Sequence, residues 1–190
     1  MDNYQESSGK SIHKDPRKNK TRAAILSAFN HLFFEDEEKN IRVGDVVDRA
    51  GIGRSTFYEH FGSVEDLYAS ALAHPMSILA NAMVGTASEE ELISLLDHFM
   101  ENQQRARRTL DGPRRQSVVK VLSTLLEERL QGWHRKNPTP RQVVLRHLAE
   151  APIALVGSWV AGDIWCSNRE LARAIITVTQ ISMDGLLTKN

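Results

Sequence analysis

The stretch IRVGDVVDRAGIGRSTFYEHF, from Ile41 to Phe61, decides the fold of this chain. In its first part, apolar residues recur at the three- and four-residue spacing of one helical face. They are Val43, Val46, Val47 and Ala50. The sequence Gly51-Ile52-Gly53 then interrupts the pattern, because glycine accepts the positive φ that ends a helix. The stretch therefore predicts two short helices joined by a tight turn, the second running from Arg54 to Phe61.

The second predicted helix has two chemically different faces. Phe57 and Phe61 stand four residues apart and form its buried side. The other positions carry hydrogen-bond donors, acceptors and an aromatic hydroxyl; they are Arg54, Ser55, Thr56, Tyr58, Glu59 and His60. A helix that only filled a core would not need such a face, whereas a helix that enters the major groove of DNA would.

With its flanks, this stretch resembles the DNA-binding domain of the TetR family of bacterial transcriptional repressors. Four blocks carry the resemblance: AAILSAF at Ala23–Phe29, V-x-D-V-V-x-R-A-G at Val43–Gly51, TFYxHF at Thr56–Phe61, and EDLY at Glu65–Tyr68. A TFYxHF block between these flanks is far more specific than a bare helix-turn-helix pattern. The resemblance covers Arg22–Leu72 of the 190 residues.

The rest of the chain indicates an all-α fold, since no segment shows sustained strand alternation. The resemblance implies an N-terminal three-helix helix-turn-helix domain followed by a C-terminal helical ligand-binding and dimerisation domain. We place a disordered tail at residues 1–17, the DNA-binding domain at residues 18–74 and the regulatory domain at residues 75–190. The second boundary rests on Pro75, which we expect to break the fourth helix. In the family this helix connects the two domains.

Several residues are candidates for DNA contacts because of their charge and place. Arg54 and Ser55, at the start of the second helix, can reach base edges or neighbouring phosphates. Arg42 precedes the first helix and is placed to hold a phosphate at its N-terminus. The basic start of the preceding helix supplies further candidates for phosphate contacts. They are Lys18, Lys20, Thr21 and Arg22.

The resemblance adds three DNA contacts, and the chain departs from the family at two positions. The family pattern places Thr56 and Tyr58 against DNA, with the Tyr58 hydroxyl on a phosphate, and His60 at the DNA backbone. Gly53 stands where relatives often have serine or threonine, so a backbone amide must replace the side-chain cap. Relatives also commonly have a lysine near Gly62 or Val64, and its absence implies weaker phosphate affinity at that end.

The composition indicates in which cellular compartment the chain is expected. Lys+Arg and Asp+Glu both number 24, so net charge does not decide for or against a nucleic-acid partner. A single cysteine, Cys166, excludes an internal disulfide framework and fits a reducing cytoplasm. No apolar run approaches the ~18 residues of a membrane span, and the N-terminus lacks the apolar segment of a signal peptide. We expect a soluble, cytoplasmic protein without a membrane partner.

The last two predicted helices are unusually apolar. Residues 151–165 are nearly uncharged, and residues 175–187 carry only Asp184. A helix that is apolar nearly all round must be buried on more than one side. We expect a homodimer through these two helices, as the resemblance also implies; a buried monomer core is the alternative. Two recognition helices about 34 Å apart would read a palindromic operator in double-stranded DNA.

The resemblance implies a small-molecule effector that binds between the regulatory helices, moves the fourth helix and releases the protein from DNA. Candidates to line such a cavity are Met83, His98, Phe99, Met100, Trp133 and Trp159. A set of methionine and aromatic residues at helical spacing also fits a plain core, and nothing in the sequence names the effector. An arginine cluster in the same domain fits a solvated face, an acidic partner or an acidic effector. It comprises Arg105, Arg107, Arg108, Arg114 and Arg115.

The sequence does not favour an enzyme, a metal site or a cofactor. The seven histidines are scattered singly, without an HExxH pair or paired metal-ligand spacing. We therefore interpret the chain as a homodimeric, ligand-responsive repressor. The alternative is a protein-interaction module that has kept the helix-turn-helix and has little DNA affinity, for which the missing lysine near Gly62 is the support. The salt dependence of DNA binding would separate the two.

Overall fold

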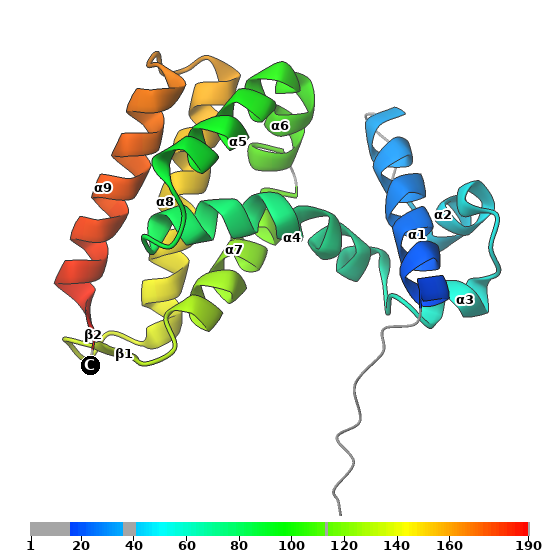
Figure 1. Cartoon of the computed structure of the whole chain (residues 1–190), viewed down its shortest axis with the longest axis horizontal. Coiled ribbons are helices and arrows are strands. Elements are labelled where there is room, and N and C mark those ends of the chain that lie inside the picture. Colours follow the sequence, from blue (N-terminus) through cyan, green and yellow to red (C-terminus); the bar gives the residue numbers. More distant parts are fainter. Residues whose placement is uncertain (1–15, 36–40, 113, 190) are drawn as a thin grey trace, which may run out of the picture. The chain divides into compact units, whose positions relative to one another are not determined.

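The computed structural model describes residues 16–35, 41–112 and 114–189. Among these residues the fold is all-α, as predicted, with one very small sheet (Figure 1). The helices are α1 (Pro16–Glu35), α2 (Val43–Ala50), α3 (Arg54–Tyr58), α4 (Val64–Met83), α5 (Glu89–Glu101), α6 (Gln103–Leu110), α7 (Arg115–Arg129), α8 (Arg141–Ala161) and α9 (Asn168–Leu186). The tail expected at residues 1–17 lies outside the described residues, except that residues 16 and 17 belong to α1.

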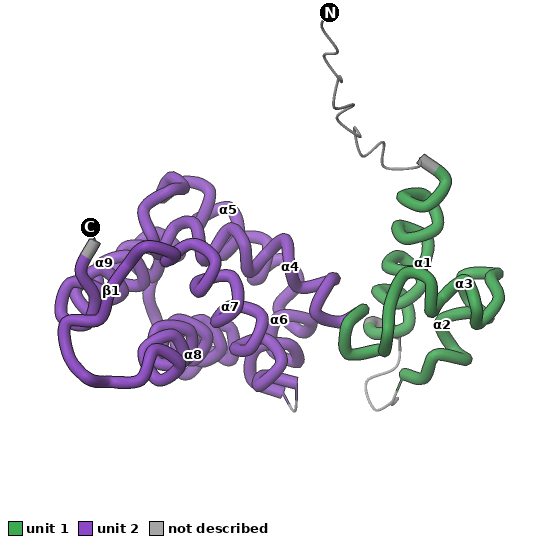
Figure 2. The backbone as a smooth tube through the Cα atoms, turned by 90° about the horizontal axis from the view of Figure 1, so that it is seen from below, with its two compact units in different colours: residues 1–67 green, residues 68–190 purple. Residues whose placement is uncertain are grey.

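The chain divides into two compact units, residues 1–67 and residues 68–190 (Figure 2). The division falls inside α4, ahead of the boundary that we placed after residue 74. Pro75 does not break this helix, because α4 continues to Met83. Leu72, Met76 and Leu79 are buried on either side of the proline. Burial of such side chains contributes about 1.5–3 kcal/mol each, which outweighs the ~3 kcal/mol cost of a proline inside a helix.

The first unit is built around the two predicted short helices. α2 ends at Gly51, whose positive φ of 65° requires glycine and whose N–H donates to the Asp48 carbonyl. α3 ends at Tyr58 and not at Phe61 as predicted. Its last backbone bonds tighten, since the His60 N–H donates to Phe57, only three residues back, and the chain leaves the helix as a turn.

The second unit packs α4–α9 around an aliphatic core. α8 packs against α6, α7 and α9, and α9 also packs against α5. The largest fully buried side chains here include Met76, Leu79, Met83, Leu92, Leu96, Leu110, Leu122 and Leu126. Capping boxes start α5 and α9: the Ser88 and Ser167 hydroxyls accept from backbone N–H groups three residues on.

A two-stranded antiparallel sheet closes the end of the second unit. β1 (Trp133–Arg135) pairs with β2 (Leu187–Lys189), with His134 opposite Thr188. We did not predict these strands, because three residues are too few to show alternation. Arg141, the first residue of α8, donates to the carbonyls of Leu130 and Trp133 and so fixes the loop that precedes β1.

Among the described helices, α8 is long and apolar enough to cross a membrane by length and composition. The sequence analysis considered only uninterrupted apolar runs, and α8 is interrupted by Arg146 and Glu150. In the structure 56% of the apolar window of α8 is buried inside the protein. That buried share fits a core helix of a globular domain. A single helix of this length and composition is only weak evidence for a membrane span.

Candidate nucleic-acid interface

Phe57 anchors α3 to the first unit and sets which way its other side chains face. Its ring is completely buried, as predicted, and lies 6.0 Å from the ring of Phe61, which is also buried. Tyr58, the next residue, stands edge-on to Phe57 and is 57% exposed. Neighbouring helical residues differ by about 100° in direction. Burial of Phe57 therefore turns Tyr58 towards solvent.

The remaining candidate residues of α3 and of the turn after it differ in exposure. Arg54 and Ser55 are exposed, whereas Thr56 and His60 are half-buried. Gly53 is the N-cap residue of α3, in an extended conformation, and no side chain caps the helix there. The exposed face thus offers a guanidinium and two hydroxyls, which are groups that hydrogen-bond to base edges and phosphates.

Arg54 lies against α2. A side chain at Gly44 would place its Cβ 3.8 Å from Nη2 of Arg54, so the guanidinium passes over the glycine. Arg42, just ahead of α2, is exposed, and its backbone N–H donates to the carboxylate of Asp45 over 2.8 Å. The two arginines therefore stand at the N-terminal half of the same helix, where its dipole also favours an anion.

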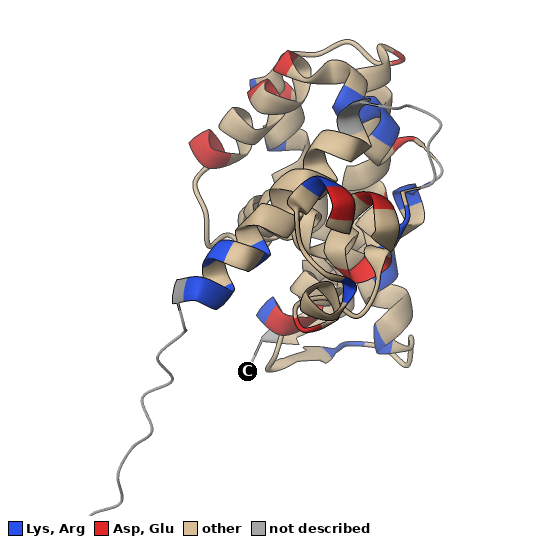
Figure 3. Ribbon diagram, turned by 90° about the vertical axis from the view of Figure 1, so that its right-hand side faces the viewer, with Lys and Arg blue, Asp and Glu red and all other residues tan. Residues whose placement is uncertain are grey.

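The basic start of α1 contains two different kinds of residue. Lys18 and Lys20 are exposed, and Figure 3 shows Lys and Arg bands where α1 follows the grey N-terminal trace. The Thr21 hydroxyl donates to the Arg17 carbonyl within the helix. Arg22 is turned inwards, with Nη1 donating to the His60 carbonyl over 3.3 Å. Its guanidinium also lies 4.2 Å from the centre of the Phe61 ring.

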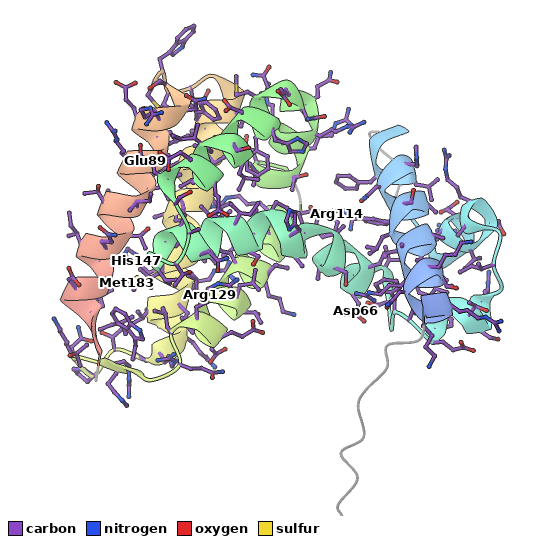
Figure 4. All side chains as sticks on the ribbon, viewed as in Figure 1. Asp66, Glu89, Arg114, Arg129, His147 and Met183 are labelled. Atoms are coloured by element: carbon purple, nitrogen blue, oxygen red, sulfur yellow. The ribbon has the colours of Figure 1, made fainter. Side chains whose placement is uncertain are left out.

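The carboxylate of Asp66 lies beside Gly62, near the point at which the sequence lacks a lysine. A Cβ at Gly62 would lie 2.8 Å from Oδ2 of Asp66, so any side chain there would have to displace that carboxylate. The Asp66 backbone N–H donates to the Ser63 hydroxyl, which caps α4. Figure 4 labels Asp66 on the first turns of this helix. An acidic group here repels phosphate, consistent with the weaker affinity that we infer for this end.

The candidate effector residues are distributed over α4, α5, β1 and α8. Met83 and Trp159 are buried, and the Trp159 indole donates to the Cys166 carbonyl over 2.9 Å. His98 and Met100 are exposed on α5, while Phe99 and Trp133 are half-buried. In the part of the chain that the structure describes, no three acidic, histidine or cysteine side chains gather in a way that would hold a metal ion.

Two members of the arginine cluster make contacts within the second unit, to which they belong. Arg115 pairs with Glu150 of α8 over 2.6 Å. The guanidinium of Arg114, labelled in Figure 4, lies 5.2 Å from the centre of the Tyr68 ring. Burial raises the pKa of Tyr68 to about 12, and the charge of Arg114 partly offsets that rise. These two arginines hold α4, α7 and α8 together, which accounts for part of the cluster without a nucleic acid.

Residues 25–71 match the family described as bacterial regulatory proteins, tetR family. The match begins in α1 and ends in α4, so it contains the whole helix-turn-helix described above. Residues 25–71 therefore form a DNA-binding domain of the TetR type. The match and the shared fold support a DNA-binding transcriptional regulator. No curated protein matches the chain significantly in sequence.

Solved structures of TetR proteins share the fold. A TetR transcriptional regulator from Streptococcus agalactiae 2603V is 26% identical, with a TM-score of 0.55 over 87% of this chain and 97% of that chain. The TetR family repressor AlkX from a Dietzia strain is 15% identical, with a TM-score of 0.48 over 87% and 98% of the two chains. The statement that the fold is shared rests on the first of these two structures.

Proposed function

We propose that this protein is a homodimeric repressor that binds a palindromic operator and is released by a small-molecule effector. The observation that carries the DNA-binding part is α3, whose exposed Arg54, Ser55 and Tyr58 surround a fully buried Phe57. In this proposal Arg54 and Ser55 read base edges in the major groove. Tyr58 holds a phosphate, as do Arg42 and the exposed lysines at the start of α1.

The proposed dimer uses the outer faces of α8 and α9. Three large apolar side chains there are exposed: Val143 of α8 at 54%, and Val178 and Ile181 of α9 at 47% and 66%. Val178 and Ile181 are three residues apart and so lie on one side of their helix. Exposed apolar groups that gather in this way favour a protein interface. A second copy would bury them and bring two α3 helices to the two half-sites of an operator.

The proposed effector is at least partly apolar. The buried side chains described in the second unit are mainly aliphatic, and Thr179 and the hydroxyl of Tyr68 are buried polar exceptions. A ligand that entered between these helices would meet mainly hydrocarbon, with Met83 and Trp159 among its neighbours. Because Met83 belongs to α4, whose first turn follows the recognition helix, a shift at Met83 would act on the helix that leads to α3.

Selection of genomic fragments by the purified full-length protein tests the proposal. The bound fragments are footprinted, and binding is repeated over a series of salt concentrations. We expect a protected palindrome and an affinity that falls steeply with salt, with about 0.9 units of log–log slope for each phosphate contact. Genes beside the protected site would then indicate the class of effector.

Failure of folded protein to enrich any fragment at low salt, with or without a metabolite extract, would contradict the proposal. That result would favour the protein-interaction module, which the carboxylate of Asp66 beside Gly62 also favours. Enrichment that appears only with the extract would show that the effector promotes binding to DNA, so the repressor mechanism would be wrong while the DNA contacts remained.

A further inference from the structure

We propose that Arg22 is a positioning residue: it fixes the end of the recognition helix against α1 and does not bind phosphate. This inference rests on the proposed operator binding, and it changes the role of one residue that the sequence placed on DNA. Arg22 is half-buried in the first turns of α1, whereas Lys18 and Lys20 on the same helix are exposed.

Arg22 holds two consecutive residues of the turn that ends α3. Its Nη1 donates to the backbone carbonyl of His60 over 3.3 Å, across 38 residues of sequence. The guanidinium carbon lies 4.2 Å from the centre of the adjacent Phe61 ring, a cation–π distance. One flat side chain thus makes a hydrogen bond and a ring contact at once.

These contacts lead directly to the DNA-reading face. The ring of Phe61 lies 6.0 Å from that of Phe57, and Phe57 is the anchor of α3. Tyr58 in turn stands edge-on to Phe57, with 5.4 Å between the ring centres. A displacement of Phe61 would therefore rotate or shift α3, and Tyr58 and Arg54 would move with it.

The chemistry also explains why arginine and not lysine suits this place. The last carbonyls of a helix and its following turn lack partners within the helix, and the negative end of the helix dipole attracts a cation. A planar guanidinium can stack on a ring and donate in its own plane, whereas a lysine ammonium is a point charge that does not do both in this geometry. If Arg22 turned to a phosphate, the His60 carbonyl would lose this donor and the Phe61 ring this cation.

The test compares Arg22→Lys and Arg22→Gln with Lys20→Gln, a matched loss of charge on the exposed side of the same helix. Each full-length variant is titrated with operator and with unrelated DNA over a salt series. For Lys20→Gln we expect equal weakening on both DNAs and a salt slope reduced by about 0.9 for each lost phosphate contact. For both Arg22 variants we expect an unchanged salt slope and a preference for operator reduced on the order of tenfold, the scale of one lost base contact.

Arg22→Lys is the decisive variant because it keeps the charge. If it bound operator as the unaltered protein does while Arg22→Gln lost about 0.9 of slope for each subunit of the dimer, Arg22 would be a phosphate contact and the proposal would be overturned. Equal loss of affinity for both DNAs by both variants would also overturn it, since Arg22 would then not orient the residues that distinguish operator from other DNA.

An NMR measurement without DNA separates this inference from the proposed function. We expect Arg22→Lys to shift the backbone amide signals of His60, Phe61 and Tyr58 and to leave those of α9 in place. Unmoved signals at the end of α3 would overturn the positioning role. If the unaltered protein bound no operator, the proposed function would fail, and these shifts would still decide the role of Arg22.

Discussion

Phe57 and Tyr58 show how one residue sets the role of its neighbour. The buried ring of Phe57 fixes the rotation of α3, and Tyr58 is 57% exposed as a result. We predict that Tyr58→Phe weakens binding to every DNA sequence by a similar factor. The variant keeps the ring and loses the hydroxyl, and a hydrogen bond to a charged group contributes about 1.5–3 kcal/mol.

Titration of the Tyr58→Phe variant with operator and with shuffled operator measures this effect. Circular dichroism provides the control that the helices are intact. A changed sequence preference with unchanged overall affinity would show that Tyr58 reads bases, which contradicts the phosphate role.

Tyr68 gives the protein a predictable response to alkaline pH. Burial raises the pKa of its hydroxyl from 10.0 to about 12, so the unfolded chain loses this proton at lower pH than the folded one. The stabilisation from the buried neutral phenol is therefore complete below pH 10 and is lost as the pH rises through 12. We predict that the free energy of unfolding falls between pH 10 and pH 12, by less in Tyr68→Phe than in the unaltered protein.

Urea denaturation at pH 8, 10 and 11 measures this difference. Phenylalanine keeps the ring beneath Arg114, so the cation–π contact is expected to persist in the variant. Parallel pH dependence of the two proteins would show that Tyr68 ionises equally in the folded and unfolded states.

At the scale of elements, α2 makes room for a side chain of α3. A Cβ added at Gly44 would lie 3.8 Å from Nη2 of Arg54. We predict that Gly44→Ala keeps the operator sequence and stabilises the protein by up to about 1 kcal/mol, since alanine favours helix more than glycine does. Gly44→Leu should displace Arg54 and change base preference at the positions that Arg54 contacts.

Selection of random DNA sequences by both Gly44 variants and by Arg54→Ala measures the preference, and thermal denaturation measures stability. Alanine serves as the control because its Cβ fits at an ordinary contact distance. A Gly44→Leu variant with unaltered preference would show that Arg54 does not read bases from its position over α2.

The elements also show where prediction from sequence succeeds and where it fails. Local signals placed α2 and its end correctly, because apolar spacing and the positive φ of Gly51 act within a few residues. The prediction that Pro75 breaks α4 was wrong, because burial of the side chains around it outweighs the cost of a proline inside a helix. β1 and β2 depend on contact between residues far apart in sequence, which a three-residue pattern does not reveal.

The candidate DNA-contacting residues divide in the same way into locally predictable ones and ones that depend on distant contacts. Composition and resemblance selected the exposed Arg54, Ser55 and Tyr58 from the sequence. The inward turn of Arg22 was not predictable, because it depends on Phe61 and the His60 carbonyl, 38 residues away. A basic residue near a helix start gives no sign of which way its side chain will point.

At the scale of the whole molecule, the proposed dimer predicts that Ile181 lies in the interface between the two subunits. Ile181 is 66% exposed in a single chain, so Ile181→Asp should leave the stability of that chain nearly unchanged. In a dimer it would place two like charges in an apolar interface. We predict that the variant sediments as a monomer and binds operator much more weakly, because one α3 helix reads only half of the site.

Sedimentation velocity over a range of protein concentrations measures the association. Ser94→Asp, an equal change of charge at an exposed position of α5, is the matched control. A dimer that persisted in Ile181→Asp would place the interface elsewhere than on this face of α9.

The contact of Arg22 with a backbone carbonyl also bears on how new specificities can arise. Any amino acid at position 60 supplies that carbonyl, so the support for α3 places no demand on the side chain there. Residues 54–56 and 58 can then change under selection for a different operator while the orientation of the helix is inherited unaltered. A designer who transplants this reader into another scaffold should carry the arginine of α1 and the aromatic ring at position 61 along with it.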